Sequence, residues 1–225
     1  MSSSRVPLAL SFLAALTVAV TACSPAALPD EAAEPSEQPT SSPSIEATTE
    51  ADAEAGVPAD LTFAAGADLD PSVGGQWGDA MIADADFAVA QADNGEGGWS
   101  YTHLATQCEV AFWQGDVSNL AVAGDDAALS DSVLAAWFQA TAAEITPYAL
   151  DEQLPLNLGG AGTFDVRTVG GESSETGENY VVSARGFGAF QGGYVVSVTC
   201  PQGQDAVALR DELRDDYLSL VLAPL

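Results

Sequence analysis

Between residues 86 and 113 the hydrophobic and polar positions follow the patterns of β-strands. Residues 86–92 and 99–113 are predicted to be extended, and the stretch DNGEGG lies between them. Asn94 and Gly95 supply the positive φ angles of a tight hairpin turn. Asp93, Asn94 and Glu96 slightly resemble a calcium loop, but the remaining EF-hand ligands are missing, so we interpret the stretch as a turn.

Two later segments have the spacing of amphipathic helices. The first is predicted over residues 125–145, before Pro147, and its apolar side carries Leu129, Val133, Trp137, Thr141 and Ile145. The second is predicted over residues 204–222, with Leu209, Leu213, Tyr217 and Leu220 on one side. Residues 162–169, 179–185 and 190–200 are predicted to be extended. This order is typical of an α+β fold, in which an antiparallel sheet packs with two amphipathic helices. We predict a single globular domain over residues 59–225.

The N-terminal residues have the pattern of an export signal. Arg5 precedes an apolar stretch over residues 6–20, and small residues follow. The sequence Val20-Thr21-Ala22-Cys23 resembles the lipobox of bacterial lipoproteins. The resemblance implies that residues 1–22 are a signal peptide and that Cys23 carries a diacylglyceryl group, with palmitate among its acyl chains. An uncleaved membrane anchor and a soluble protein cut after Ala22 are the alternatives.

Residues 23–58 are predicted to be a tether. After Cys23 they are rich in proline, serine, threonine and acids and contain no aromatic or basic residue. Such a segment cannot bury enough apolar surface to offset its ordering entropy, so we expect it to be disordered. The lipobox, the tether and the element order together resemble the PsbP/Mog1-like domains of LpqN-type actinobacterial lipoproteins. This resemblance covers most of residues 60–222 and implies a sheet flanked by helices.

The charge balance excludes several functions. The chain has 33 acidic residues against five basic ones, and its formal net charge is −28. All five basic residues are arginines: Arg5, Arg167, Arg185, Arg210 and Arg214. Nucleic-acid binding needs a basic surface, and both the P-loop and Schiff-base chemistry need a lysine, so none of these is expected. The acidic surface is either a solvated coat or an attraction for Ca²⁺ or a basic partner.

The two cysteines outside the lipobox are predicted to form a disulfide. If Cys23 carries lipid, Cys108 and Cys200 remain as a pair in an oxidising compartment. Both lie on the more apolar face of a predicted strand. There is no C-x-x-C motif, and two distant cysteines with one histidine make a poor metal site, so we expect neither a metal nor a cofactor.

The other face of residues 99–113 is the candidate ligand-binding site. It carries aromatic and polar side chains: Trp99, Tyr101, His103, Gln107, Glu109 and Trp113. If exposed, this face would suit a sugar, a peptide or an apolar ligand; the alternative is that a helix covers it as core. No G-x-S-x-G motif accompanies His103, the only histidine, so a serine hydrolase finds little support.

We therefore expect a lipoprotein anchored to the extracytoplasmic face of the cell membrane. Its domain would bind an envelope glycan or protein without catalysing a reaction. One alternative is an envelope hydrolase that uses His103 or a pair of carboxylates. Another is a carrier that holds an apolar ligand between the sheet and a helix.

Overall fold

The computed structural model describes residues 60–120, 125–156 and 162–224. The predicted signal peptide, Cys23 and the whole of the predicted tether lie outside these ranges. None of the helices within them combines the length and the apolar character needed to cross a membrane.

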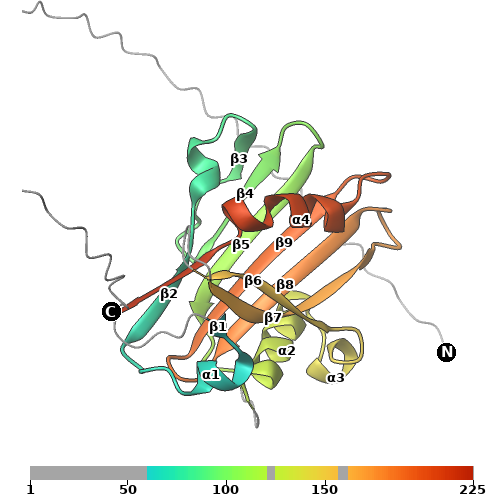
Figure 1. Cartoon of the computed structure of the whole chain (residues 1–225). Helices are drawn as coiled ribbons and strands as arrows, with labels where there is room; N and C mark the ends of the chain where they lie inside the picture. The colour runs from blue at the N-terminus through green and yellow to red at the C-terminus, as the bar shows by residue number, and fades with distance from the viewer. Residues whose placement is uncertain (1–59, 121–124, 157–161, 225) are drawn as a thin grey trace, which may run out of the picture. The chain divides into compact units, whose positions relative to one another are not determined.

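A ten-stranded sheet dominates the described part of the chain (Figure 1). Its strands are β1 (Asp60–Leu61), β2 (Val73–Trp77), β3 (Phe87–Gln91), β4 (Gly98–His103), β5 (Cys108–Asp116), β6 (Leu150–Leu156), β7 (Gly162–Glu172), β8 (Asn179–Phe187), β9 (Gly192–Cys200) and β10 (Leu220–Pro224). Their order across the sheet is β2-β10-β6-β7-β8-β9-β5-β4-β3, and β1 pairs in parallel with β7. Four short α-helices accompany them: α1 (Phe63–Ala67), α2 (Asp126–Trp137), α3 (Ala142–Ile145) and α4 (Ala206–Tyr217).

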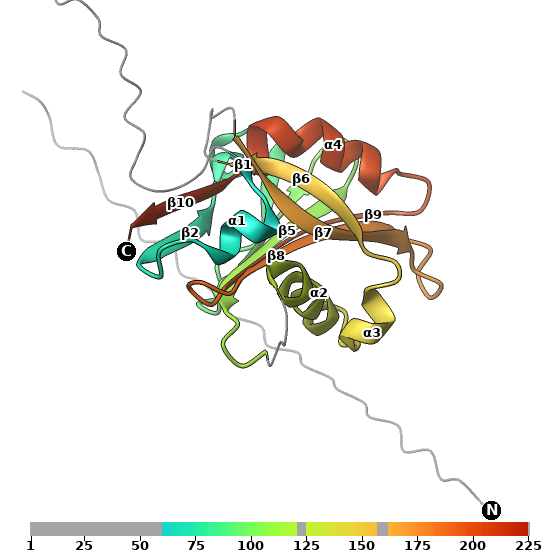
Figure 2. The ribbon, with the colours of Figure 1, turned by 60° about the horizontal axis from the view of Figure 1, so that its bottom comes forward.

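The predicted α+β fold, an antiparallel sheet packed with two amphipathic helices, is wrong, because the strands themselves enclose most of the core. Figure 2 shows that the sheet curls. Trp77 of edge strand β2 packs against residues of the sheet's central strands. Its ring lies 5.7 Å from that of Phe112, 6.1 Å from that of Phe164 and 6.4 Å from that of Tyr194. The fold is therefore β-rich, and its helices are small additions to a curled sheet.

The missed strands explain the error. Strand β2 contains two glycines, and β6 contains two acids and a proline, so neither has the alternation of a typical strand. The second predicted helix was too long: α4 ends at Tyr217, and Leu220–Pro224 pairs with β2 as β10. The apolar side of residues 204–222 thus belongs partly to a helix and partly to a strand.

Small helices cover both faces of the sheet. On the inner face, Leu209 and Leu213 of α4 join the larger core cluster. On the outer face, Leu129, Val133 and Leu134 of α2 join a second cluster with residues of β8 and β9. Figure 2 shows α4 on one side of the curled sheet and α2 with α3 on the other.

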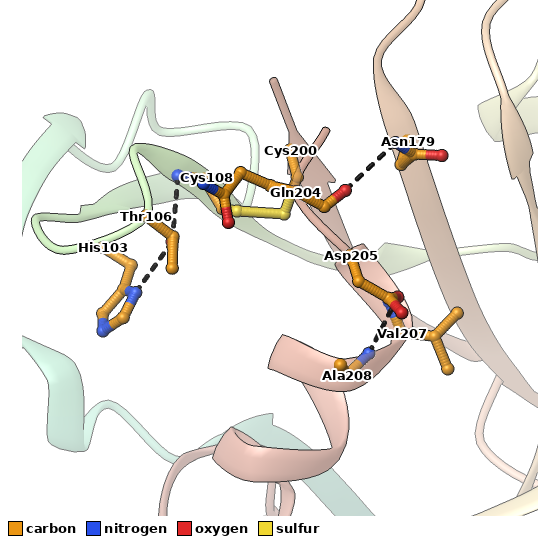
Figure 3. Close-up of a disulfide and its surroundings, with 9 residues drawn as sticks. All are labelled: His103, Thr106, Cys108, Asn179, Cys200, Gln204, Asp205, Val207 and Ala208. Atoms are coloured by element: carbon orange, nitrogen blue, oxygen red, sulfur yellow. Dashed lines mark hydrogen bonds between the residues drawn. A yellow bond between two sulfur atoms is a disulfide. The ribbon is translucent and has the colours of Figure 1, made fainter. Parts of the chain in front are cut away.

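The predicted disulfide between Cys108 and Cys200 is present (Figure 3). Cys108 begins β5 and Cys200 ends β9, and the register that pairs Glu109 with Thr199 brings the cysteines opposite each other. The two Cα atoms are 4.2 Å apart, close to the narrow spacing of non-hydrogen-bonded pairs in antiparallel sheets. Just beyond, the Asp205 carboxylate caps α4 by accepting from the N–H groups of Val207 and Ala208.

Candidate functional site: a groove on the outer face of the sheet

The segment predicted as one strand over residues 99–113 is a hairpin, formed by β4 and β5. Its turn includes Gln107, whose φ is 59°. The register pairs Trp99 with Phe112 and His103 with Cys108. Because directly opposed residues share a face, Trp99, Tyr101 and His103 point to the inner side, while Glu109 and Trp113 point to the outer side. The structure therefore divides the predicted site residues between two faces.

The inner-face members are held by local contacts. Tyr101 is buried and its hydroxyl donates to Asp79; burial and this bond both raise the pKa of Tyr101. His103 Nδ1 lies 2.9 Å from the hydroxyl of Thr106, in the hairpin turn (Figure 3). The Trp99 ring stacks on Phe112 with 5.5 Å between their centroids. These contacts give Tyr101 and His103 structural partners on the face away from Glu109.

On the outer face the structure forms a pocket of about 420 Å³, which we call the outer groove. The residues that define it are Ser100, Glu109, Ala111, Trp113, Trp137, Ser197 and Thr199, and Trp99 also borders it. Its floor is a row of small side chains across three adjacent strands, because Ser100 pairs with Ala111 and Ala111 pairs with Ser197. Small residues in one cross-strand row leave a depression where larger ones would fill the surface.

Large side chains bound this row on both sides. On β5, Trp113 lies two residues after Ala111 and Glu109 lies two residues before it, so all three share the outer face. The Trp113 ring rests on a glycine pair: a Cβ added at Gly115 would lie 2.7 Å from the ring, and one at Gly193 would lie 3.1 Å from it. Trp137, the last residue of α2, is 37% exposed and also lines the groove. The groove thus has an aromatic end and a carboxylate end.

A second, apolar pocket of about 300 Å³ adjoins the outer groove. The two share Trp113 and Trp137, and the rest of the apolar pocket is lined by Val117, Leu120, Val133, Ala136 and Val195. It therefore lies between α2 and strands β5 and β9, at the edge of the outer core cluster.

The polar chemistry of the outer groove is neutral or acidic. The Ser100 side chain is buried, and its Oγ has no hydrogen-bond partner in the described structure. Glu109 is the one acidic residue among those that line the groove, and no basic residue lines it. The arginines that the structure describes are all paired with carboxylates: Arg167 with Asp131 and Asp151, Arg185 with Asp126, Arg210 with Glu152 and Asp211, and Arg214 with Asp215.

Nothing in the described ranges favours a metal centre. No group of three or more histidine, cysteine, aspartate or glutamate side chains there is arranged to hold an ion. The groove instead offers hydroxyl groups, amides from Gln91 and Asn94, one carboxylate and partly exposed indole rings. Such groups bind a neutral polar ligand by hydrogen bonds and stacking.

Sequence reasoning found part of this site. It singled out Glu109 and Trp113, which the groove brings together with Trp99. It assigned Trp137 to the buried side of a helix, and it gave no role to the small residues Ser100, Ala111 and Ser197. Small residues carry no chemical signal of their own, and their alignment across β4, β5 and β9 depends on the strand register.

Comparisons with known proteins assign no family. No protein-family description and no curated protein matches this sequence. A crystal structure from Bacteroides thetaiotaomicron VPI-5482, at 1.50 Å resolution, aligns with 63% of this chain at 14% identity and a TM-score of 0.36. The chain spans 42% of that protein's length.

Proposed function

We propose that this protein is a lipid-anchored lipoprotein on the extracytoplasmic face of the membrane, and that its domain binds a neutral glycan of the cell envelope in the outer groove. The proposed anchor rests on the lipobox Val20-Thr21-Ala22-Cys23. A single acyl chain gives only marginal membrane binding, whereas the two acyl chains of a diacylglyceryl group on Cys23 would give stable anchoring.

The observation that carries the glycan proposal is the row Ser100, Ala111 and Ser197, lying between an indole and a carboxylate. A sugar ring is flat enough to lie over small side chains. Its C–H groups pack on an indole ring, and its hydroxyls donate to a carboxylate such as that of Glu109. The lack of a basic residue in the groove favours an uncharged glycan over an anionic one.

The same geometry favours binding over hydrolysis. Most glycoside hydrolases need two carboxyl groups on either side of the scissile bond, and the outer groove offers Glu109 alone. His103 lies on the opposite face of the hairpin and bonds to Thr106. A sugar bound in the outer groove would therefore contact one carboxylate, that of Glu109, and would not reach His103.

The apolar pocket supports a second candidate function, the transport of an apolar ligand. Its lining between α2 and the sheet suits a hydrophobic molecule. The two candidates differ in where the ligand sits, because a glycan would contact Glu109 and an apolar ligand would contact Val117 and Val133. A neutral fluorescent probe such as N-phenyl-1-naphthylamine tests for the second. Its binding, lost in Val133→Gln and unaffected by Glu109→Gln, would favour the carrier.

Binding to an array of neutral and acidic glycans tests the first candidate. We expect neutral glycans to bind, and Trp137→Ala to weaken binding by about tenfold or more, which corresponds to roughly 1.4 kcal/mol. Glu109→Gln should also weaken it. Tyr148→Ala is the matched control, because Tyr148 is an aromatic residue that is 73% exposed and does not line the groove. Equal binding by Trp137→Ala and wild type, or binding of acidic glycans alone, would contradict the proposal.

Cell fractionation tests the anchor independently. We expect a Cys23→Ala protein to leave the membrane fraction, because it would lack the thiol that takes the diacylglyceryl group. A Cys23→Ala protein that stays in the membrane fraction as fully as the wild type would rule the anchor out.

A further inference from the structure

Apart from the two-residue strand β1 beside β7, the curled sheet ends in two edge strands, β2 and β3. The chain passes from β2 to β3 through the short 3₁₀ helix η1 (Ala80–Ala83). An edge strand carries backbone N–H and C=O groups that can pair with another chain. Proteins protect such edges with charged side chains, prolines or internal partners. The two edges of this sheet differ in that protection.

Strand β2 has internal partners for its outward backbone groups. The N–H of Trp77 donates to Oε1 of Gln114 over 3.0 Å, and the N–H of Gly75 donates to the hydroxyl of Tyr194. The Trp77 indole also donates to the carbonyl oxygen of Trp113, over 3.1 Å. These bonds from β2 to β5 and β9 occupy the positions that a partner strand would use.

Strand β3 pairs with β4 alone in the described structure, and the protection there is limited to a register shift in its ladder between Val89 and Gln91. The N–H of Leu104 donates to the carbonyl oxygen of Asp86, which shows which residues of β3 turn their backbone groups toward β4. Hydrogen-bonded and non-hydrogen-bonded pairs alternate along an antiparallel ladder. The backbone N–H and C=O of Ala88 therefore point toward β4, and those of Val89 point toward the free edge. The strand FAVAQ contains no charge and no proline, and four of its five residues are exposed.

A pocket of about 460 Å³, which we call the edge pocket, lies beside this strand and is also lined by Gln76 and Trp77 of β2. Val89 and Ile82 line it and are 55% and 66% exposed, which is high for large aliphatic side chains. Trp99 also lines it, and its indole N–H is buried without a partner in the described ranges. A strand lying along β3 could place alternate side chains over these residues.

Charge indicates the kind of partner. Asp79 and Asp93 line the edge pocket and no basic residue does. The arginines of the described chain are all engaged by carboxylates, so no unpaired arginine there offsets these acids. A second copy of the chain, with its net charge of −28, would be repelled by this edge.

We propose that β3 accepts an extended segment of a basic partner protein as an additional strand, with alternate apolar side chains in the edge pocket. Backbone pairing with Val89 would provide affinity, and lysine or arginine residues near Asp93 would provide selectivity. The edge pocket shares Gln91 and Trp99 with the outer groove, but Val89 and Asp93, on which this proposal rests, do not line that groove.

A displayed library of random nine-residue peptides, selected on the purified full chain, is the probe. We expect enrichment of peptides in which β-branched residues alternate with lysine or arginine. A synthetic peptide of the enriched sequence should slow hydrogen exchange of the Val89 amide. Val89→Pro should reduce its affinity about tenfold or more, because proline removes the outward N–H and leaves the Ala88 bonds to β4 in place.

Matched variants keep the result interpretable if Val89→Pro disturbs folding. Val89→Thr retains the N–H and should retain binding. Asp93→Asn should weaken binding of the basic peptide while the Asn side chain still accepts from the Gly95 N–H, as Asp93 does over 2.9 Å. Enrichment of acidic peptides, no enrichment, or equal affinity of Val89→Pro and Val89→Thr would overturn the proposal. So would a Val89 amide already protected without peptide, or dimerisation of the chain that Val89→Pro abolishes.

Discussion

Arg185 and Asp126 form an ion pair inside the protein, with 3.0 Å between Nη2 and Oδ2. The guanidinium lies over the rings of Phe63 and Phe187, at 4.6 and 4.5 Å from their centroids. It also donates to the carbonyl oxygens of Thr62 and Asp165. Burial lowers the pKa of Arg185 to about 10, which leaves it charged at neutral pH. The pair therefore joins β8 to the first residues of α1 and α2.

Removing one partner of this pair should destabilise the fold strongly. Asp126→Ala would leave the arginine charge buried and unpaired, and such losses cost about 3 to 5 kcal/mol. Urea unfolding followed by circular dichroism measures the change. Arg214→Ala is the control, because the Arg214–Asp215 pair is solvent-exposed and should change the free energy of unfolding little. Similar small effects of both substitutions would show that the buried pair has no special role.

The disulfide should account for a large part of the stability. It closes a sequence separation of 92 residues, for which the chain-entropy model gives about 4 to 5 kcal/mol. We expect the Cys108→Ser/Cys200→Ser protein to unfold at lower urea concentration by about this free energy. A Cys23→Ala chain, denatured without reductant, should react with no thiol reagent. Titration of two thiols in that chain would exclude the bond.

Alkaline pH should unfold the protein partly through Tyr194. Burial raises the pKa of Tyr194 to about 12, while an unfolded tyrosine titrates near 10. The native state therefore binds the proton more tightly, so this contribution is fully present below pH 10 and is lost as the pH rises toward 12. We expect the free energy of unfolding to fall more steeply across pH 10–12 in wild type than in Tyr194→Phe. Parallel curves for the two proteins would contradict this expectation.

The glycine beneath Trp113 should control the shape of the outer groove. A methyl group at position 115 would meet the indole at 2.7 Å, so Gly115→Ala should displace the ring and weaken glycan binding. Gly170→Ala is the matched control, because its Cβ would lie 3.4 Å from its nearest neighbour, an ordinary contact. Glycan titration and thermal unfolding of both variants check this. Unchanged affinity in a folded Gly115→Ala protein would mean that Trp113 does not position the ligand.

Hydrophobic periodicity located the main elements but not their connections. It placed strands β3, β7, β8 and β9 close to where they lie. It also found α2 and α4, but the first predicted helix breaks after Trp137 and resumes as α3, and the second ran on into β10. It joined α4 to β10 because Leu220 falls at helical spacing from Leu213 and Tyr217. A strand of five residues can continue the spacing of a preceding helix by chance, and only its pairing with β2 distinguishes the two.

The candidate site was predictable only where single residues carry chemistry. Glu109 and Trp113 were found, but a turn between β4 and β5 reversed the face of Trp99 relative to Trp113. When a chain reverses within a predicted strand, the residues that share a face change. The four residues of this turn contain neither glycine nor proline, so no signal in the sequence indicated the reversal. The role of Trp137 depends on how α2 lies against β5, which local sequence does not determine.

The pairing of β2 with β10 has a consequence for the order of folding. Val73 lies opposite Pro224, so edge strand β2 cannot join the sheet until almost the whole chain is available. Strand β1 likewise waits for β7, about a hundred residues later. The formation of β10 therefore completes the sheet. The domain should therefore acquire its native structure only after β10 has been synthesised.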